Sequence, residues 1–313
     1  MKTGSWIEAN RAGAFLGQHA IVILGLLLLG LFAAALALWR LFDQQENKLW
    51  NFAEAAWRQF EGFFLVSKFR DRFPGAWTMV THRLSPEGYL GLHFTISLCL
   101  LTVTATSFLA IADEVGEQDW LVHFDRSLSL SLHEHATLHA VKIFELVTNL
   151  GNVWTLAWIG LLVAIVLVFT RRWQLLSVWV IALIGTGYVN VFLKNTFRRV
   201  RPELLNPWIT ERGWSFPSGH AMGSLVVYGM LAYSIALMIT NRSLRFGLVF
   251  ITISLVIAIG FSRVYLGVHY FSDVIAGYLA AGFWLVLCLS GNEVARRHRK
   301  FRRQDTTPTR KPA

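Results

Sequence analysis

The chain has 313 residues, of which 54% are hydrophobic and only 15% are charged. Ordinary soluble domains carry roughly 25% charged residues, so this balance excludes a disordered chain, a collagen and a coiled coil. The net charge is +10, and most of the excess lies in the tail that follows Val294. A basic tail beside an apolar helix is typical of the cytoplasmic side of a membrane protein, where it contacts anionic headgroups. We therefore expect membrane lipids as partners and no nucleic acid.

Apolar runs long enough to cross a membrane recur along the chain. A hydrocarbon core of ~30 Å needs about 20 apolar residues in a helix, and unpaired backbone groups are costly in lipid. In chain order the runs are Ala20–Trp39, Leu92–Ala112, Val153–Thr170, Trp173–Leu193, His220–Thr240, Phe246–Phe261 and Phe271–Ser290. The sequence thus predicts an all-α integral membrane protein with a six-helix transmembrane core and one extra N-terminal transmembrane helix.

Three regions follow from these runs. Residues 1–91 are predicted to be an N-terminal extension with one transmembrane helix and an aromatic-rich amphipathic segment. Residues 92–290 are predicted to form the core, and residues 291–313 a basic cytoplasmic tail.

Basic residues in the short loops predict the orientation. Arg171 and Arg172 join the third and fourth runs, and Arg242 and Arg245 join the fifth and sixth. These loops and the tail lie on one side, which we expect to be cytoplasmic. We expect a multi-pass protein of the bacterial inner membrane whose other loops face the periplasm or the exterior.

The outer segment between the fourth and fifth runs breaks the orientation rule. It carries five cations: Lys194, Arg198, Arg199, Arg201 and Arg212. Cations placed on that side need a reason, and an anionic ligand is the natural one.

Three motifs fall on this outer side. They are Lys194-x6-Arg201-Pro202, Pro217-Ser218-Gly219-His220 and Ser262-Arg263-x5-His269-x3-Asp273. A guanidinium is a planar fork that suits phosphate oxygens, and an ammonium is a point charge. The start of a helix favours an anion through its free N–H groups, and glycine allows close approach. The predicted phosphate-binding residues are therefore Lys194, Arg201, Ser218, Gly219 and Arg263.

Two histidines and one carboxylate complete the set. His269 and Asp273 are four residues apart and would share one face if the last helix begins here. A carboxylate on one ring nitrogen fixes the tautomer and leaves the other nitrogen free to attack phosphorus. His220 lies beside the anion-binding turn and is placed to protonate a leaving alkoxide. We expect phosphoryl transfer with no metal and no cofactor.

The three motifs resemble those of the type 2 phosphatidic acid phosphatase superfamily (PAP2, or lipid phosphate phosphatases), which shares its site with vanadium haloperoxidases. The resemblance covers about Leu92 to Ser290, and every signature position is matched. It implies a six-helix membrane core and a metal-independent phosphatase that works through a phosphohistidine. By that resemblance His269 is the nucleophile, Asp273 its partner and His220 the acid.

Several alternatives stay open at this point. The substrate is expected to be a lipid phosphate or diphosphate of the phosphatidic acid, phosphatidylglycerol phosphate or undecaprenyl diphosphate class. A phosphotransferase that passes the phosphate to a lipid acceptor such as lipid A would use the same motifs. An anion or lipid transporter would need polar or broken helices near the bilayer midplane, whereas the polar clusters here lie at the ends of the apolar runs.

A second group of histidines, His133, His135 and His139, lies in the outer segment between the second and third runs. Its four-residue spacing is found in metal sites on helices. The surrounding leucines and valines favour an amphipathic helix at the membrane interface instead.

Overall fold

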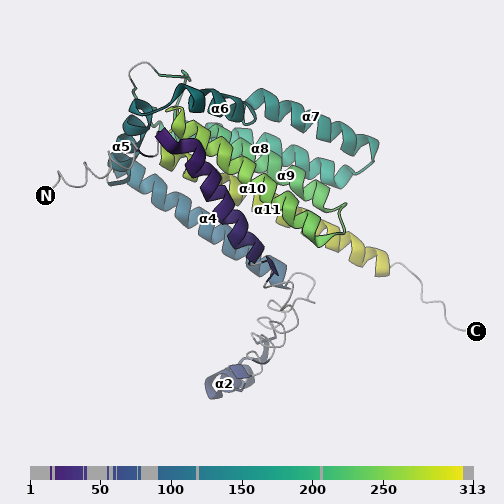
Figure 1. Cartoon of the computed structure of the whole chain (residues 1–313). Helices are drawn as coiled ribbons and strands as arrows, with labels where there is room; N and C mark the ends of the chain where they lie inside the picture. Colours follow the sequence, from purple (N-terminus) through teal and green to yellow (C-terminus); the bar gives the residue numbers. More distant parts are fainter. Residues whose placement is uncertain are drawn as a thin grey trace, which may run out of the picture. The chain divides into compact units, whose positions relative to one another are not determined.

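The computed structural model describes residues 15, 18–37, 39–40, 55, 59–60, 62–75, 77–78, 91–117, 120–204 and 207–305, and every regular element there is helical (Figure 1). The elements are the N-terminal helix Gln18–Ala37, α2 (Phe64–Arg72), α4 (Gly91–Glu117), α5 (Trp120–Glu134), α6 (Leu138–Asn149), α7 (Val153–Phe169), α8 (Trp173–Phe197), α9 (Gly219–Ala236), α10 (Arg242–Tyr265) and α11 (Phe271–Asp305). The predicted all-α class is confirmed. Most of the predicted amphipathic segment, and the tail beyond residue 305, lie outside the described residues.

The chain separates into two units. One takes in the described residues of Met1–Gly25 and Leu100–Glu293, and the other those of Leu26–Cys99 and Val294–Ala313. Every site residue expected from the sequence belongs to the first unit, so that unit alone concerns the site. The three regions expected from the sequence remain a prediction.

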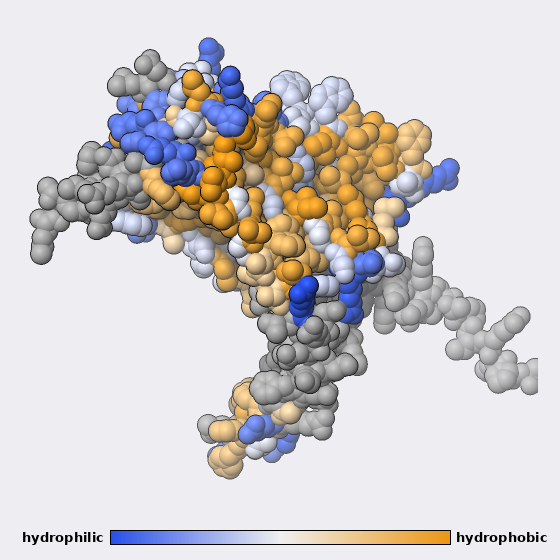
Figure 2. All heavy atoms as spheres, in the orientation of Figure 1, coloured by the Kyte–Doolittle hydropathy of each residue, from blue (hydrophilic) through white to orange (hydrophobic). Residues whose placement is uncertain are grey.

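Six described helices are long and apolar enough to cross a membrane. They are Gln18–Ala37, Phe94–Glu117, Leu138–Phe169, Trp173–Phe197, Arg242–Tyr265 and Phe271–Arg296. Figure 2 shows hydrophobic residues over the flank of the bundle that includes α7, and hydrophilic residues gathered where α5 lies. Large exposed side chains on α7, such as Trp158 and Phe169, are suited to contact with lipid. The protein is therefore a multi-pass membrane protein.

The predicted run His220–Thr240 forms α9, which is shorter than expected and differs from the six helices above. It lies among α7, α8 and α10 (Figure 1) and buries nine of its 18 residues. Small residues such as Gly223 and Ser224 suit a helix whose neighbours are protein side chains. A Cβ added at Gly223 would lie 2.8 Å from Leu156 of α7, so glycine allows this close packing.

One close approach sets the geometry of the end of the bundle where α9 begins. A Cβ at Gly277, in α11, would lie 2.8 Å from the carbonyl oxygen of Ser218, just before α9. The Ser218 N–H also donates to the carbonyl oxygen of Asp273 at 2.9 Å. The start of α9 and the first turn of α11 are thereby fixed against each other.

The segment between α4 and α7 forms α5 and α6. Thr137 caps α6 by accepting from the Ala140 N–H, and the Phe144 ring lies 4.7 Å from the Tyr265 ring of α10, centroid to centroid. The Nδ1 atom of His135 is 2.9 Å from the Ser131 carbonyl oxygen, and the His133 ring lies against Trp208. Within the described residues, no three His, Cys, Asp or Glu side chains are grouped as metal ligands would be.

We predict that Gly277→Ala destabilises the protein by about 1–3 kcal/mol, since the added methyl meets a backbone oxygen that has to shift. Thermal unfolding in detergent measures the effect. The matched control is Gly291→Ala in the same helix, where no described heavy atom lies within 4 Å of the added methyl. Equal unfolding temperatures for the two variants would show that the approach of α11 to α9 is not tight.

Candidate active site

The three motifs meet at one end of the first unit. Lys194 lies in the last turn of α8, and Ser218 is the N-cap of α9. Arg263 lies in the last turn of α10, and Asp273 in the first turn of α11. Segments that are up to 79 residues apart in the chain (273 − 194) therefore contribute to one site.

His269 and Asp273 form a buried pair. The Nδ1 atom of His269 lies 3.3 Å from Oδ2 of Asp273, and their side chains are 1% and 0% exposed. The condition for a shared helix face is not met, because α11 begins at Phe271, where the last apolar run was predicted to begin. Instead, Gly267 adopts a φ of +70° just after α10, a conformation that favours glycine, and the turn brings His269 back over Asp273.

Hydrogen bonds surround the Asp273 carboxylate. Its Oδ2 atom accepts from the Ser215 hydroxyl and, at 2.9 Å, from the Tyr270 N–H. Its Oδ1 atom accepts from Nη1 of Arg199 at 2.6 Å. Because these donors favour the ionised form and fix its position, Asp273 is suited to orient His269.

The imidazole of His269 is held neutral. Its burial outweighs the neighbouring carboxylate of Asp273 and lowers the pKa of His269 to about 4. The proton of the neutral ring belongs on Nδ1, which faces Asp273. The Nε2 atom then carries the lone pair, and it lies 3.2 Å from Nη1 of Arg201.

The predicted cations converge beside this ring. Lys194 donates to the Trp214 carbonyl oxygen at 2.6 Å, and Arg201 Nη1 donates to the Val268 carbonyl oxygen at 2.7 Å. Arg263 is 1% exposed, and its Nη1 donates to the Thr148 hydroxyl at 2.8 Å. The structure thus brings the three cations together, as expected.

The remaining predicted residues lie at the start of α9. Gly219 is its first residue, and the Ser218 hydroxyl accepts from the Ala221 N–H. His220 follows in the first turn, where it interacts electrostatically with Arg263 and His269. The helix start and its histidine therefore face the same cluster of charges.

Sequence reasoning missed Glu211. Its Oε2 atom lies 3.2 Å from Nη2 of Arg201, and its Oε1 atom accepts from Nη2 of Arg263. Burial favours the neutral acid, but the charge of Arg263 outweighs it and lowers the pKa of Glu211 to about 2. Two cations of the motifs are thus paired with an acid in the segment that connects α8 and α9. The spacing of the motifs does not indicate this acid.

A second missed group lies behind the pair of His269 and Asp273. Asp125 of α5 is 1% exposed and accepts from Nη2 of Arg199 at 2.9 Å. It also accepts from the Ser272 N–H at 3.1 Å and from the Ser272 hydroxyl. Arg199 therefore bridges Asp125 and Asp273, and its guanidinium lies 4.3 Å from the centroid of the Tyr270 ring.

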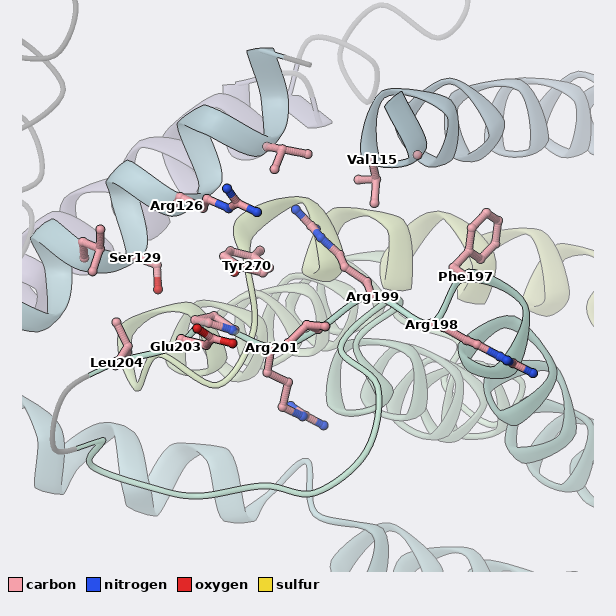
Figure 3. Close-up of a pocket in the computed structure, with 15 residues that line it drawn as sticks. Val115, Arg126, Ser129, Phe197, Arg198, Arg199, Arg201, Glu203, Leu204 and Tyr270 are labelled. Carbon is pink, nitrogen blue, oxygen red and sulfur yellow. The ribbon is translucent and has the colours of Figure 1, made fainter. Parts of the chain in front are cut away.

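A pocket of about 670 Å³ adjoins this group (Figure 3). Its wall is built by the ends of α4 and α8, by α5 and by the segment that follows α8. In Figure 3, Arg126 and Arg199 lie near Tyr270, whereas Arg201 points to the other side of the segment. Apolar residues such as Val115 and Phe197 complete the lining. The pocket is amphipathic, and of the three cations in the motifs only Arg201 is among its lining residues.

Comparison with known proteins decides the family. The PAP2 superfamily model matches residues 173–297, which contain all three motifs. Phosphatidylglycerophosphatase B of Bacillus subtilis (strain 168) is 32% identical over 148 residues, which are 46% of this chain and 71% of that protein. The chain belongs to the PAP2 superfamily. The expected family is thereby confirmed, and so is the expected class of enzyme, a PAP2-type phosphatase.

Two further relatives are more distant. Undecaprenyl-diphosphatase of Sulfolobus acidocaldarius is 29% identical over 177 residues, which are 54% of this chain and 78% of that protein. The crystal structure of a transmembrane PAP2 type phosphatidylglycerolphosphate phosphatase from Bacillus subtilis has a TM-score of 0.45 and 23% identity. The match covers 70% of this chain and 97% of that one.

We predict that Asp125→Asn lowers kcat for phosphate release and leaves KM almost unchanged, since Asp125 holds Arg199 and does not reach the cations of the motifs. Breaking a buried ion pair also costs about 3 kcal/mol of stability. Steady-state kinetics and thermal unfolding measure the two effects. Asp113→Asn, at an exposed carboxylate, is the control. A loss of stability with an unchanged kcat would mean that Asp125 does not position Asp273.

The low pKa of His269 predicts an acid limb of kcat/KM near pH 4. Protonation removes the lone pair of the ring, and it occurs only as the pH falls to about 4 because burial disfavours the cation. The measurement is the rate of phosphoryl transfer to the enzyme between pH 4 and 7, corrected for ionisation of the substrate. A limb near pH 6.5 that the substrate does not explain would contradict the assignment.

Proposed function

We propose that this PAP2 protein hydrolyses the terminal phosphate of a membrane lipid phosphate or diphosphate. The observation that carries the proposal is the neutral His269, held by Asp273, with its free nitrogen beside Arg201. Relatives named phosphatidylglycerophosphatase B and undecaprenyl-diphosphatase support substrates of the phosphatidylglycerol phosphate or undecaprenyl diphosphate class. The amphipathic pocket supports a lipid, because it offers both cations and apolar walls.

In the proposed first step, Nε2 of His269 attacks phosphorus. The bond from phosphorus to the lipid oxygen breaks, and His220 gives a proton to that oxygen. Burial lowers the pKa of His220 to about 3 in the empty site, and the negative charge of the bound phosphate would raise that pKa so that the ring can carry this proton. Asp273 stabilises the positive charge that develops on the imidazole. In the second step water attacks the phosphohistidine, His220 takes a proton from the water, and inorganic phosphate and free His269 result.

The remaining residues stabilise charge on the phosphoryl oxygens. Lys194, Arg201 and Arg263 supply cations, and the N–H groups near Ser218 and Gly219 supply the helix start. These groups fill the role that a metal ion plays in other phosphatases, so we propose a metal-independent reaction.

We propose that the protein resides in a bacterial inner membrane with this site facing the periplasm or the exterior. Arg171 and Arg172 between α7 and α8, and Arg242 and Arg245 at the start of α10, lie at the other ends of the helices. Basic residues at such positions are cytoplasmic by the positive-inside rule. The basic tail would then contact anionic headgroups on the cytoplasmic side.

The purified full chain in detergent should release inorganic phosphate from phosphatidylglycerol phosphate, phosphatidic acid or undecaprenyl diphosphate, and excess EDTA should not abolish the release. Vanadate should inhibit, because it mimics the transition state in the cradle of cations. His269→Ala should reduce turnover by several orders of magnitude, as loss of a nucleophile does in other hydrolases. Labelled phosphate should be trapped as an acid-labile, base-stable adduct on the wild-type chain alone.

Three results would contradict parts of this proposal. Activity lost in EDTA and restored by magnesium would require a metal. Full activity in His269→Ala would exclude that residue as nucleophile. Appearance of the label on an added lipid acceptor such as lipid A, without free phosphate, would identify a phosphotransferase.

A further inference from the structure

Glu211 occupies the place that the proposed function reserves for phosphate. Its two carboxylate oxygens contact Arg201 and Arg263, which are two of the three cations in the motifs. It also interacts electrostatically with His220 and His269. A carboxylate and a phosphoryl group need the same N–H donors, so both cannot occupy them at once. Two anions side by side would also repel each other strongly in a site of low dielectric.

The carboxylate of Glu211 is needed beside Arg263 for a physical reason. Arg263 is 1% exposed, and a buried guanidinium without a partner costs several kcal/mol. Glu211 supplies the missing charge while no substrate is bound. Its low pKa keeps it ionised at every pH at which a lipid phosphate would bind, so the competition is permanent.

The carboxylate does not fill all of the donors. Nε of Arg263 is buried and has no hydrogen-bond partner among the residues that the structure describes. A terminal phosphate carries a charge of about −1.5 to −2 and three acceptor oxygens, one more oxygen than a carboxylate. A terminal phosphate can therefore accept a hydrogen bond from Nε of Arg263, and it also brings more negative charge to the arginines than the carboxylate does.

We propose that Glu211 is a specificity-determining residue that makes the site reject phosphodiesters. This proposal rests on the proposed function. A phosphodiester in a bulk phospholipid has one negative charge and two free oxygens, like the carboxylate, so it gains nothing by displacing Glu211. A terminal phosphate has more negative charge and more free oxygens than the carboxylate, so it displaces Glu211. A site that opens at a membrane surface meets phosphodiesters in large excess, so this discrimination matters for turnover.

Displacement needs only rotation of the side chain. The backbone around Glu211 is anchored separately, since the Gly213 carbonyl oxygen accepts from Arg201 and the Trp214 carbonyl oxygen accepts from Lys194. The side chain of Glu211 is 27% exposed, which leaves it a path to solvent. The carboxylate can therefore leave while the segment stays in place.

The test is Glu211→Gln in the full chain, which removes the charge and keeps the shape. Competition for a shared site raises an apparent dissociation constant by the reciprocal of the fraction of sites that the competitor leaves free, so its removal should tighten binding. Inorganic phosphate and vanadate should bind at least tenfold more tightly, as measured by titration calorimetry without turnover. In mixed micelles of phosphatidic acid and phosphatidylglycerol, phosphatidylglycerol should inhibit the variant much more strongly than the wild type.

The matched control is Glu134→Gln, an exposed acid at the end of α5 that does not line the pocket, which makes the same change in net charge and should behave as the wild type. Glu211→Asp keeps the charge but shortens the side chain, and its phosphate affinity should lie between those of the wild type and Glu211→Gln. If Glu211→Gln does not fold, the affinity of Glu211→Asp decides, because a value equal to the wild type would overturn the proposal.

Unchanged or weaker phosphate binding in a folded Glu211→Gln would also overturn it, since Glu211 would then only hold the two arginines in place. A different result would contradict the proposed function. If no lipid phosphate is hydrolysed by the wild type while Glu211→Gln still gains phosphate affinity, the phosphatase assignment is wrong and the competition by Glu211 stands.

Discussion

Pairing of buried charges is the constraint on which the site depends. The side chains of Arg199 and Arg263 are 9% and 1% exposed, and burying an unpaired charge costs more than the bundle could recover by packing. Two arrangements result. Arg199 bridges the fully buried carboxylates Asp125 and Asp273, whereas Arg201 and Arg263 share Glu211. With Lys194, the second group has three cations against one acid, a net charge of +2 (3 − 1), which suits a dianionic phosphoryl group.

The helices provide the rigid frame that these charges need. The central helix α9 is held by protein on several sides, and its start is fixed to α11 through the close approach of Gly277 to Ser218. The first backbone N–H groups of α9 lie in the turn that carries His220, which interacts electrostatically with Arg263. Burial inside the bundle thus fixes the helix terminus that we propose binds phosphate near His269.

The sequence predicted what local patterns encode. Long apolar runs correspond to the spanning helices, and motif spacing identified the cations and the pair of His269 and Asp273. Prediction from the sequence failed for features that depend on tertiary contacts. The burial of α9 depends on its protein neighbours, and the turn at Gly267 brings His269 to Asp273. Asp125 lies 148 residues (273 − 125) from the carboxylate that it supports, in a segment whose pattern indicates only an amphipathic helix.

The difference in exposure between the acids agrees with their different tasks. Asp273 must keep one position through both proposed steps, and it is fully buried with donors on both oxygens. Asp125, equally buried, neutralises the cation that holds it. Glu211 remains 27% exposed, because an anion that yields to substrate needs a path to water, where its charge is solvated after displacement. A fully buried Glu211 would bind the arginines too tightly for any phosphate to enter, and a fully exposed one would leave Arg263 unpaired. Partial burial is therefore the condition under which one carboxylate can stabilise the empty site and still be replaced.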